Sequence, residues 1–75
     1  MSMGYAERLA IRAVVRGLVK AGALKAPGVR TIVAELQKAA WDIIEETGAF
    51  DDAEGIRGLA GDLETDAAEA ATRRS

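Results

Sequence analysis

The 75-residue sequence contains no cysteine and no histidine. Without them no disulfide can form, and ordinary zinc, haem and iron–sulfur ligation is excluded. A cysteine nucleophile and a histidine general base are excluded as well. Serine occurs only near the chain ends, at Ser2 and Ser75. We therefore expect a protein that is not an enzyme and that binds no metal and no cofactor.

Large apolar residues are also scarce. Apolar residues make up 49% of the chain, but alanine supplies 16 of them, and leucine, isoleucine, valine and phenylalanine together supply 17. One domain covering residues 1–75 can bury only a small core, and such domains usually need a disulfide, a metal or oligomerisation for stability. Since the first two are excluded, we expect self-association, as a homo-oligomer, or a protein partner.

Long hydrophobic runs are missing. No segment approaches the roughly 18 apolar residues of a membrane-spanning helix, and the N-terminus lacks the apolar stretch of a signal peptide. Together with the lack of cysteine, this favours a cytoplasmic protein. The cationic first helix has no aromatic anchor of the kind found in interfacial helices, so we do not expect a membrane partner.

Three helical patterns are present, at about 5–24, 29–47 and 52–70, and no segment alternates with a period of two. The sequence therefore predicts an all-α fold, a small helical bundle. We expect the first two helices to form an antiparallel hairpin, with a weaker third helix packed against it. The tail, 68–75, is expected to fray.

Turn residues divide these helices. Pro27, the only proline, lies at the break before the second helix or, alternatively, in the first turn of that helix. Gly48 is placed to end the second helix in a left-handed conformation. Asp51 and Glu54 have the spacing of a capping box, with Asp51 as the N-cap of the third helix. Phe50, just before it, is then expected to dock on the bundle.

The first helix carries two kinds of residue on its surface. Apolar and small residues share one face, which we expect to pack in the bundle: Ala10, Ile11, Val14, Gly17, Leu18 and Ala21. Four cations lie four residues apart on the other side: Arg8, Arg12, Arg16 and Lys20. Val15 and Val19 lie beside these cations and are left over once the bundle face is filled.

The second and third helices each have one apolar stripe. In the second helix the stripe consists of Val29, Ile32, Val33, Leu36, Ala40, Ile43 and Ile44. In the third helix it consists of Ile56, Leu59, Ala60, Leu63, Ala67 and Ala70. Three glycines in the third helix, Gly55, Gly58 and Gly61, each cost roughly 1 kcal/mol relative to alanine. They indicate a poorly formed helix or, alternatively, a close approach between helices.

Trp41 lies about 120° from the centre of the second stripe at 100° per residue. A tryptophan off the core face is a candidate interface anchor. The alternative is that the first or third helix covers it inside the bundle. Both interpretations predict that Trp41 is substantially buried in the working assembly.

Charge is divided between the two halves of the chain. Residues 1–40 hold 7 cations and 2 anions, whereas residues 41–75 hold 3 cations and 10 anions. The halves can attract each other within one chain or between antiparallel copies. The cationic stripe can accordingly be solvated or paired within the chain, contact an acidic partner, or contact nucleic acid.

These observations favour a non-catalytic protein–protein interaction module, a small oligomeric or accessory subunit that docks on a larger protein. The residues expected to bind the partner are Arg8, Arg12, Val15, Arg16, Val19, Lys20 and Trp41. Inhibitors and minor structural subunits, including many viral and phage proteins, are of this kind. The alternative is a nucleic-acid-associated regulator that uses the basic first helix and shields it with the acidic half. We do not expect nucleic acid as the partner, because the chain is acidic overall and no aromatic residue lies among the cations.

Overall fold

Over residues 4–74 the chain forms three helices joined by short turns. The computed structural model describes the backbone of residues 4–74 and the side chains of residues 4–70. The helices are α1 (Tyr5–Lys20), α2 (Ala26–Thr47) and α3 (Phe50–Arg74), and the described residues contain no strand. The predicted all-α fold and small helical bundle are confirmed.

The ends of α1 and α2 follow from local backbone chemistry. Gly48 adopts a left-handed conformation (φ 70°), and its N–H donates to the carbonyls of Ile43 and Ile44, as predicted for the end of α2. Pro27 lies in the first turn of α2. Backbone N–H groups in a first turn have no acceptor within the helix, so proline is tolerated there. The helix therefore begins at Ala26, earlier than predicted. α1 ends at Lys20 because the chain turns at Gly22, whose φ is 79°.

The start of α3 differs from the prediction. The helix begins at Phe50, so Asp51 lies inside its first turn, near the positive end of the helix dipole, and is not the N-cap. The hydroxyl of Thr47 accepts a hydrogen bond from the backbone N–H of Ala49 at 3.2 Å, which closes the turn instead. Phe50 is 65% exposed, so its expected docking on the bundle is wrong.

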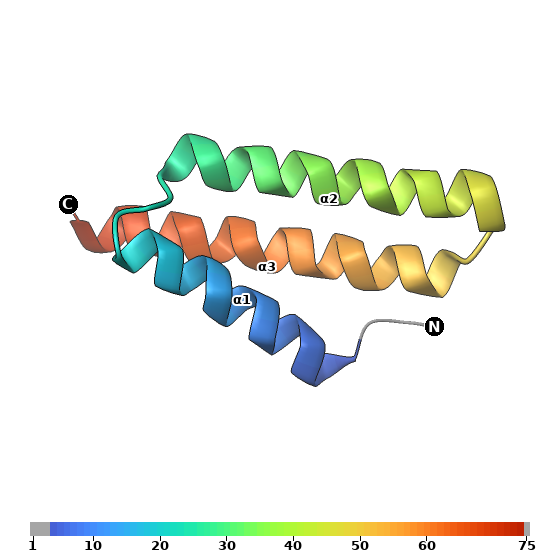
Figure 1. Ribbon diagram of the computed structural model, residues 1–75, viewed down its shortest axis with the longest axis horizontal. Coiled ribbons are helices and arrows are strands. Elements are labelled where there is room, and N and C mark those ends of the chain that lie inside the picture. Colours follow the sequence, from blue (N-terminus) through green and yellow to red (C-terminus); the bar gives the residue numbers. More distant parts are fainter. Residues whose placement is uncertain (1–3, 75) are drawn as a thin grey trace.

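The helices are not packed equally. Figure 1 shows α2 and α3 side by side and antiparallel, while α1 runs in the same direction as α3 and crosses it obliquely. The N-terminal half of α1 diverges from the other two helices, and its C-terminal half lies against the C-terminal half of α3 (Figure 1). The tightest antiparallel pair is therefore α2 with α3, not the first two helices.

The core lies mainly between α2 and α3. The buried hydrophobic residues are Val15, Val29, Val33, Ala40, Ala53, Leu59, Ala60 and Leu63. Half of them belong to α3, including Leu59 and Leu63, the largest fully buried side chains. The stripes predicted for the second and third helices are thus confirmed, and α3 is a central element of the bundle despite its glycines. The backbone is helical as far as Arg74; Ser75, at the end of the expected frayed tail, lies outside the described residues.

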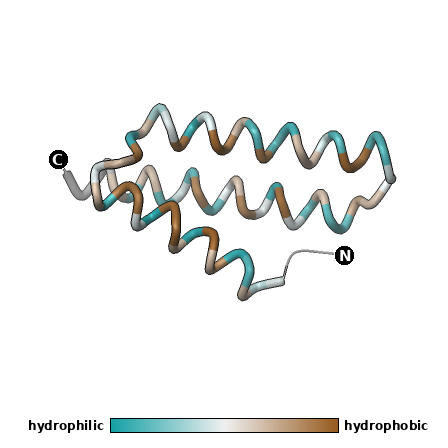
Figure 2. The backbone as a smooth tube through the Cα atoms, viewed as in Figure 1, coloured by the Kyte–Doolittle hydropathy of each residue, from teal (hydrophilic) through white to brown (hydrophobic). Residues whose placement is uncertain are grey.

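For α1, the expected face is the wrong one. Ile11, Val14 and Leu18 are 37%, 63% and 42% exposed, whereas Val15 is only 9% exposed. Figure 2 shows hydrophobic residues recurring along this loosely attached helix. The side of α3 that α1 meets carries Asp62 and Asp66, and only the cationic side of α1 can pair with them. The side of α1 that meets the bundle therefore combines the cations with Val15, which is buried in the core.

Candidate functional site

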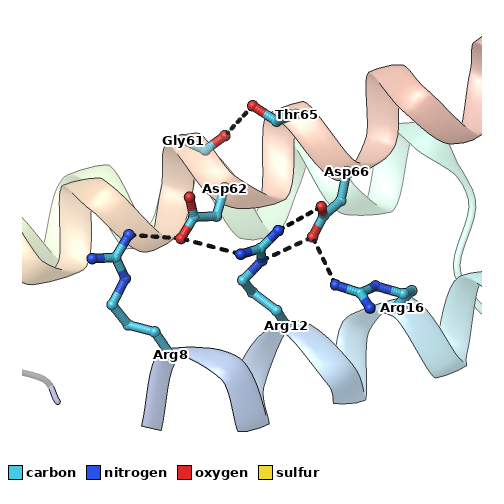
Figure 3. A network of polar contacts seen from close by, with 7 residues as sticks. All are labelled: Arg8, Arg12, Arg16, Gly61, Asp62, Thr65 and Asp66. Carbon is cyan, nitrogen blue, oxygen red and sulfur yellow. Dashed lines mark hydrogen bonds and ion pairs between the residues drawn. The ribbon is translucent and has the colours of Figure 1, made fainter. Parts of the chain in front are cut away.

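Two arginines of α1 form short ion pairs with two aspartates of α3. Arg8 donates from Nη2 to Oδ2 of Asp62 at 2.6 Å. Arg12 makes a two-pronged contact with Asp66, from Nε to Oδ2 at 3.1 Å and from Nη2 to Oδ1 at 2.8 Å. Such planar, paired contacts are the strongest form of arginine–carboxylate recognition. Figure 3 shows the side chains of both helices converging in the space between them.

Longer ion pairs link these contacts into a network, which we call the Arg–Asp ladder (Arg8, Arg12, Arg16, Asp62 and Asp66). Arg12 Nη1 lies 3.9 Å from Asp62 Oδ2, and Arg16 Nη2 lies 3.7 Å from Asp66 Oδ2. Side chains four residues apart lie on the same face of a helix, so equal spacing on two parallel helices lets successive pairs meet. Three cations against two carboxylates leave the ladder with one net positive charge.

The ladder changes the acidity of one carboxyl group. The hydrogen bond from Arg12 lowers the pKa of Asp66, and the nearby charges of Arg12 and Arg16 act in the same direction, against the effect of burial. The same hydrogen bond raises the pKa of Arg12. Both groups are therefore charged at neutral pH, and the pair is held by hydrogen bonds as well as by charge.

A glycine makes room for the first rung of the ladder. A Cβ atom built on Gly58 would lie 2.9 Å from Nη2 and 3.1 Å from Cζ of Arg8. The guanidinium of Arg8 thus lies directly on the backbone of α3. At Gly61, by contrast, an added Cβ would meet nothing within 4 Å. Close approach therefore accounts for Gly58 but not for Gly61.

A groove lies beside the ladder, where all three helices meet. Five of the seven residues predicted to bind a partner line it: Arg12, Val15, Arg16, Val19 and Lys20. It continues past Val19 toward Leu24 and Lys25 in the α1–α2 turn. Its apolar lining also includes Val29, Leu63, Ala67 and Ala70. We call this the three-helix groove.

The structure places the predicted residues in different roles. Arg8 and Arg12 are engaged within the chain, and Arg16 reaches Asp66 while half of its side chain stays exposed. Lys20 is exposed at the edge of the groove, and Val19 is half-buried in it. The matching signal in the sequence is the four-residue spacing of Asp62 and Asp66, which equals that of the arginines.

Trp41 lies apart from the groove. It is 55% exposed and borders an open depression with Gln37, Lys38 and Arg57. Neighbouring helices therefore do not cover it within one chain. The interpretation that the first or third helix covers Trp41 is therefore wrong. Burial of Trp41 would have to come from another molecule.

The exposed face of α1 is the feature that sequence reasoning missed. Its large side chains are Ile11, Val14 and Leu18, and Ala10, Gly17 and Ala21 on the same face are exposed too. None of these six residues is charged. We call them the α1 outer face. The periodicity that marks this face in the sequence predicts an apolar contact but not with which element.

Among the described residues, no three acidic side chains gather closely enough to hold a metal ion. Over the same part of the chain, no helix has the length and apolar character needed to cross a membrane. No protein-family model matches the chain, and no curated protein and no solved structure matches it significantly.

Proposed function

We propose that this protein is a non-catalytic protein–protein interaction module that binds a helix of its partner on the α1 outer face. The observation that carries the proposal is the exposure of Ile11, Val14 and Leu18 on one uncharged helix face. Contiguous exposed apolar surface of this kind is typical of interaction sites. A helix with its own apolar stripe is the partner element that such a face fits.

The small residues of this face support a helical partner. Ala10, Gly17 and Ala21 are exposed between the larger side chains. Side-chain ridges of one helix pack into grooves of another, and small residues allow the two backbones to approach closely. An Ala built on Gly17 would meet nothing within 4 Å, so the free chain itself makes no use of this space.

The attachment of α1 supports the proposal as well. Its packing against the rest of the chain rests on Val15, Val19 and the Arg–Asp ladder. A partner that covers the outer face would add apolar burial to a helix that has little of its own. Exposed Trp41 offers a second anchor on a separate surface.

The ladder also bears on the nucleic-acid alternative. Arg8 and Arg12 already pair with Asp62 and Asp66, so half of the charge of the basic stripe is neutralised within the chain. Phosphate contacts would have to compete with these pairs. We therefore retain the protein-interaction function and make nucleic acid one outcome of its test.

Site-specific photo-crosslinking in the native host tests this function. A photoreactive residue replaces Val14 on the outer face, and the matched control carries it at Glu35, an exposed position of α2. We expect Val14 to crosslink to one defined protein, either another polypeptide or a second copy, and Glu35 not to do so. Introducing Leu18→Glu should abolish that product. Equal labelling from both positions, or crosslinks to nucleic acid alone, would contradict the proposal.

A further inference from the structure

The two ends of the bundle carry opposite charge. Residues 16–30 contain four cations and no carboxylate, and residues 42–56 contain six carboxylates and no cation. The first segment includes the α1–α2 turn and the second includes the α2–α3 turn. Figure 1 places these turns at opposite ends of the longest axis, which measures 42 Å. We call them the basic end and the acidic end.

The basic end contains the three-helix groove. Its lining here is apolar and includes Val19, Val29 and Ala67. Cations stand around it: Arg16, Lys20 and Lys25. Two carboxylates, Asp66 and Glu69, also line the groove, and Asp66 is held by Arg12 and Arg16. The small side chains of Ala67 and Ala70 leave the space between α1 and α3 unfilled.

The acidic end carries an exposed aromatic residue. Phe50 is 65% exposed at the start of α3, and carboxylates precede and follow it. The exposed acidic residues around this turn are Glu45, Glu46, Asp51 and Glu54. An exposed phenylalanine among carboxylates is the complement of an apolar groove among cations. One chain cannot join its own ends, because they are separated along the long axis of the bundle (Figure 1).

We propose that the protein associates with copies of itself head to tail, with Phe50 of one copy inserted into the three-helix groove of the next. The aromatic ring is buried against the apolar lining, while the carboxylates of the acidic end face Lys20 and Lys25. Complementary charge fixes the orientation and speeds the encounter, and apolar burial holds the contact. A head-to-tail contact leaves one free end on each side, so it builds chains or rings rather than only dimers.

This inference rests on the proposed function only in that self-association is one form of protein–protein interaction. The residues are different, because the α1 outer face takes no part in the contact between ends. The two proposals can therefore fail independently of each other.

Two variants test the contact. The acidic-end variant is Phe50→Ala with Asp51→Lys, and the basic-end variant is Lys20→Glu with Lys25→Glu. All four positions are exposed, and circular dichroism verifies that both variants fold. In light scattering, the mass of the unaltered protein should rise with concentration beyond that of a dimer. Each variant alone should stay monomeric.

The decisive sample is an equimolar mixture of the two variants. Each one retains the end that the other lacks, so the mixture should form a one-to-one dimer and no longer chain. Raising the salt from about 0.1 M to about 1 M shortens the Debye length from about 10 Å to about 3 Å and should slow the formation of this dimer. A mixture that stays monomeric, or an unaltered protein that is monomeric at every concentration, overturns the inference.

Two controls separate this contact from other forms of assembly. Trp41→Ala removes another exposed aromatic ring, which is 55% exposed, and should leave the association unchanged. Val14→Asp alters the α1 outer face and should also have no effect on it. Association that survives in the acidic-end variant but is lost in Val14→Asp would place assembly on the outer face. That result would support the proposed function and overturn the head-to-tail contact.

Discussion

Helix α3 holds its two neighbours by different means. Toward α2 it presents Leu59, Ala60 and Leu63, and their burial is nearly complete. Toward α1 it presents Asp62 and Asp66, and the contact consists largely of ion pairs with side chains that are 19–50% exposed. Apolar burial contributes stability in proportion to area, whereas partly exposed ion pairs contribute little. The comparison indicates that α2 and α3 form a stable pair. Helix α1 is attached to this pair more weakly, through contacts that depend on the matching positions of charged side chains.

The largest effect should come from the apolar interface. Replacing Leu59 by Ala removes a fully buried side chain and should lower the free energy of unfolding by about 2–5 kcal/mol. Leu18→Ala, at a leucine that is 42% exposed, is the matched control and should change it by about 0.5 kcal/mol or less. Thermal unfolding followed by circular dichroism measures both. Equal losses would show that α1 is as firmly packed as α3.

The next effect separates the two interfaces. Asp66→Asn keeps the size of the side chain but removes the charge that Arg12 and Arg16 contact. We expect the amides of α1 to exchange hydrogen for deuterium several-fold faster, while those in the middle of α2 and α3 keep their protection. Glu64→Gln, at an exposed carboxylate of the same helix, is the control. Uniformly faster exchange in all three helices would mean that the bundle opens as a single unit.

Acid should have a smaller effect on the same contact. The pKa of Asp66 is lowered in the folded chain from its ordinary value of 3.8, chiefly by the hydrogen bond from Arg12. The stabilisation is thus complete above the unfolded value and is lost as the pH falls through the lower folded value. Exchange of the α1 amides, corrected for intrinsic rates, should accelerate below about pH 4, and Asp66→Asn should show no such step. The same acid step in both proteins would assign it to another carboxyl group.

The smallest effect compares two glycines of α3. An alanine at Gly61 meets no neighbour, so it should raise the free energy of unfolding by about 0.5–1 kcal/mol through helix propensity. An alanine at Gly58 must displace the guanidinium of Arg8 and should give a smaller gain. Denaturant titration of the two variants gives the difference. Equal gains in the two variants would show that the Arg8–Asp62 ion pair contributes nothing to the free energy of unfolding.

What could be predicted from the sequence follows the same division. Apolar periodicity identifies the buried faces of α2 and α3, because burial there is decided by hydrophobicity alone. Gly48 places the C-terminal end of α2, because it acts through its own backbone. Pro27 marks only the neighbourhood of the start, because proline fits both a break and a first helical turn. For Phe50 the capping-box pattern of Asp51 and Glu54 gave a wrong prediction, because α3 begins at Phe50 itself and the side chain is exposed.

The face of α1 could not be predicted in this way. Hydrophobicity favours burial of Ile11 and Val14, but the side that faces α3 carries Val15 and the arginines, whose aspartate partners lie 54 residues away along the chain. Periodicity within one helix carries no information on which side of another helix it will meet. The equal spacing of the arginines and aspartates is the one signal that links the two segments, and it acts only once both helices have formed.

The spacing of the Arg–Asp ladder has a consequence for the register of α1. If α1 moved along its axis by one helical turn, about 5.4 Å, Arg12 would face Asp62 and Arg16 would face Asp66. Both carboxylates would again be paired, so the charges alone permit two positions. Val19 could replace Val15, but Ala23, beyond the end of the helix, would then have to replace Val19. The second valine and the short link to α2 therefore select the observed position, and lengthening that link would leave Val19 alone to hold the register.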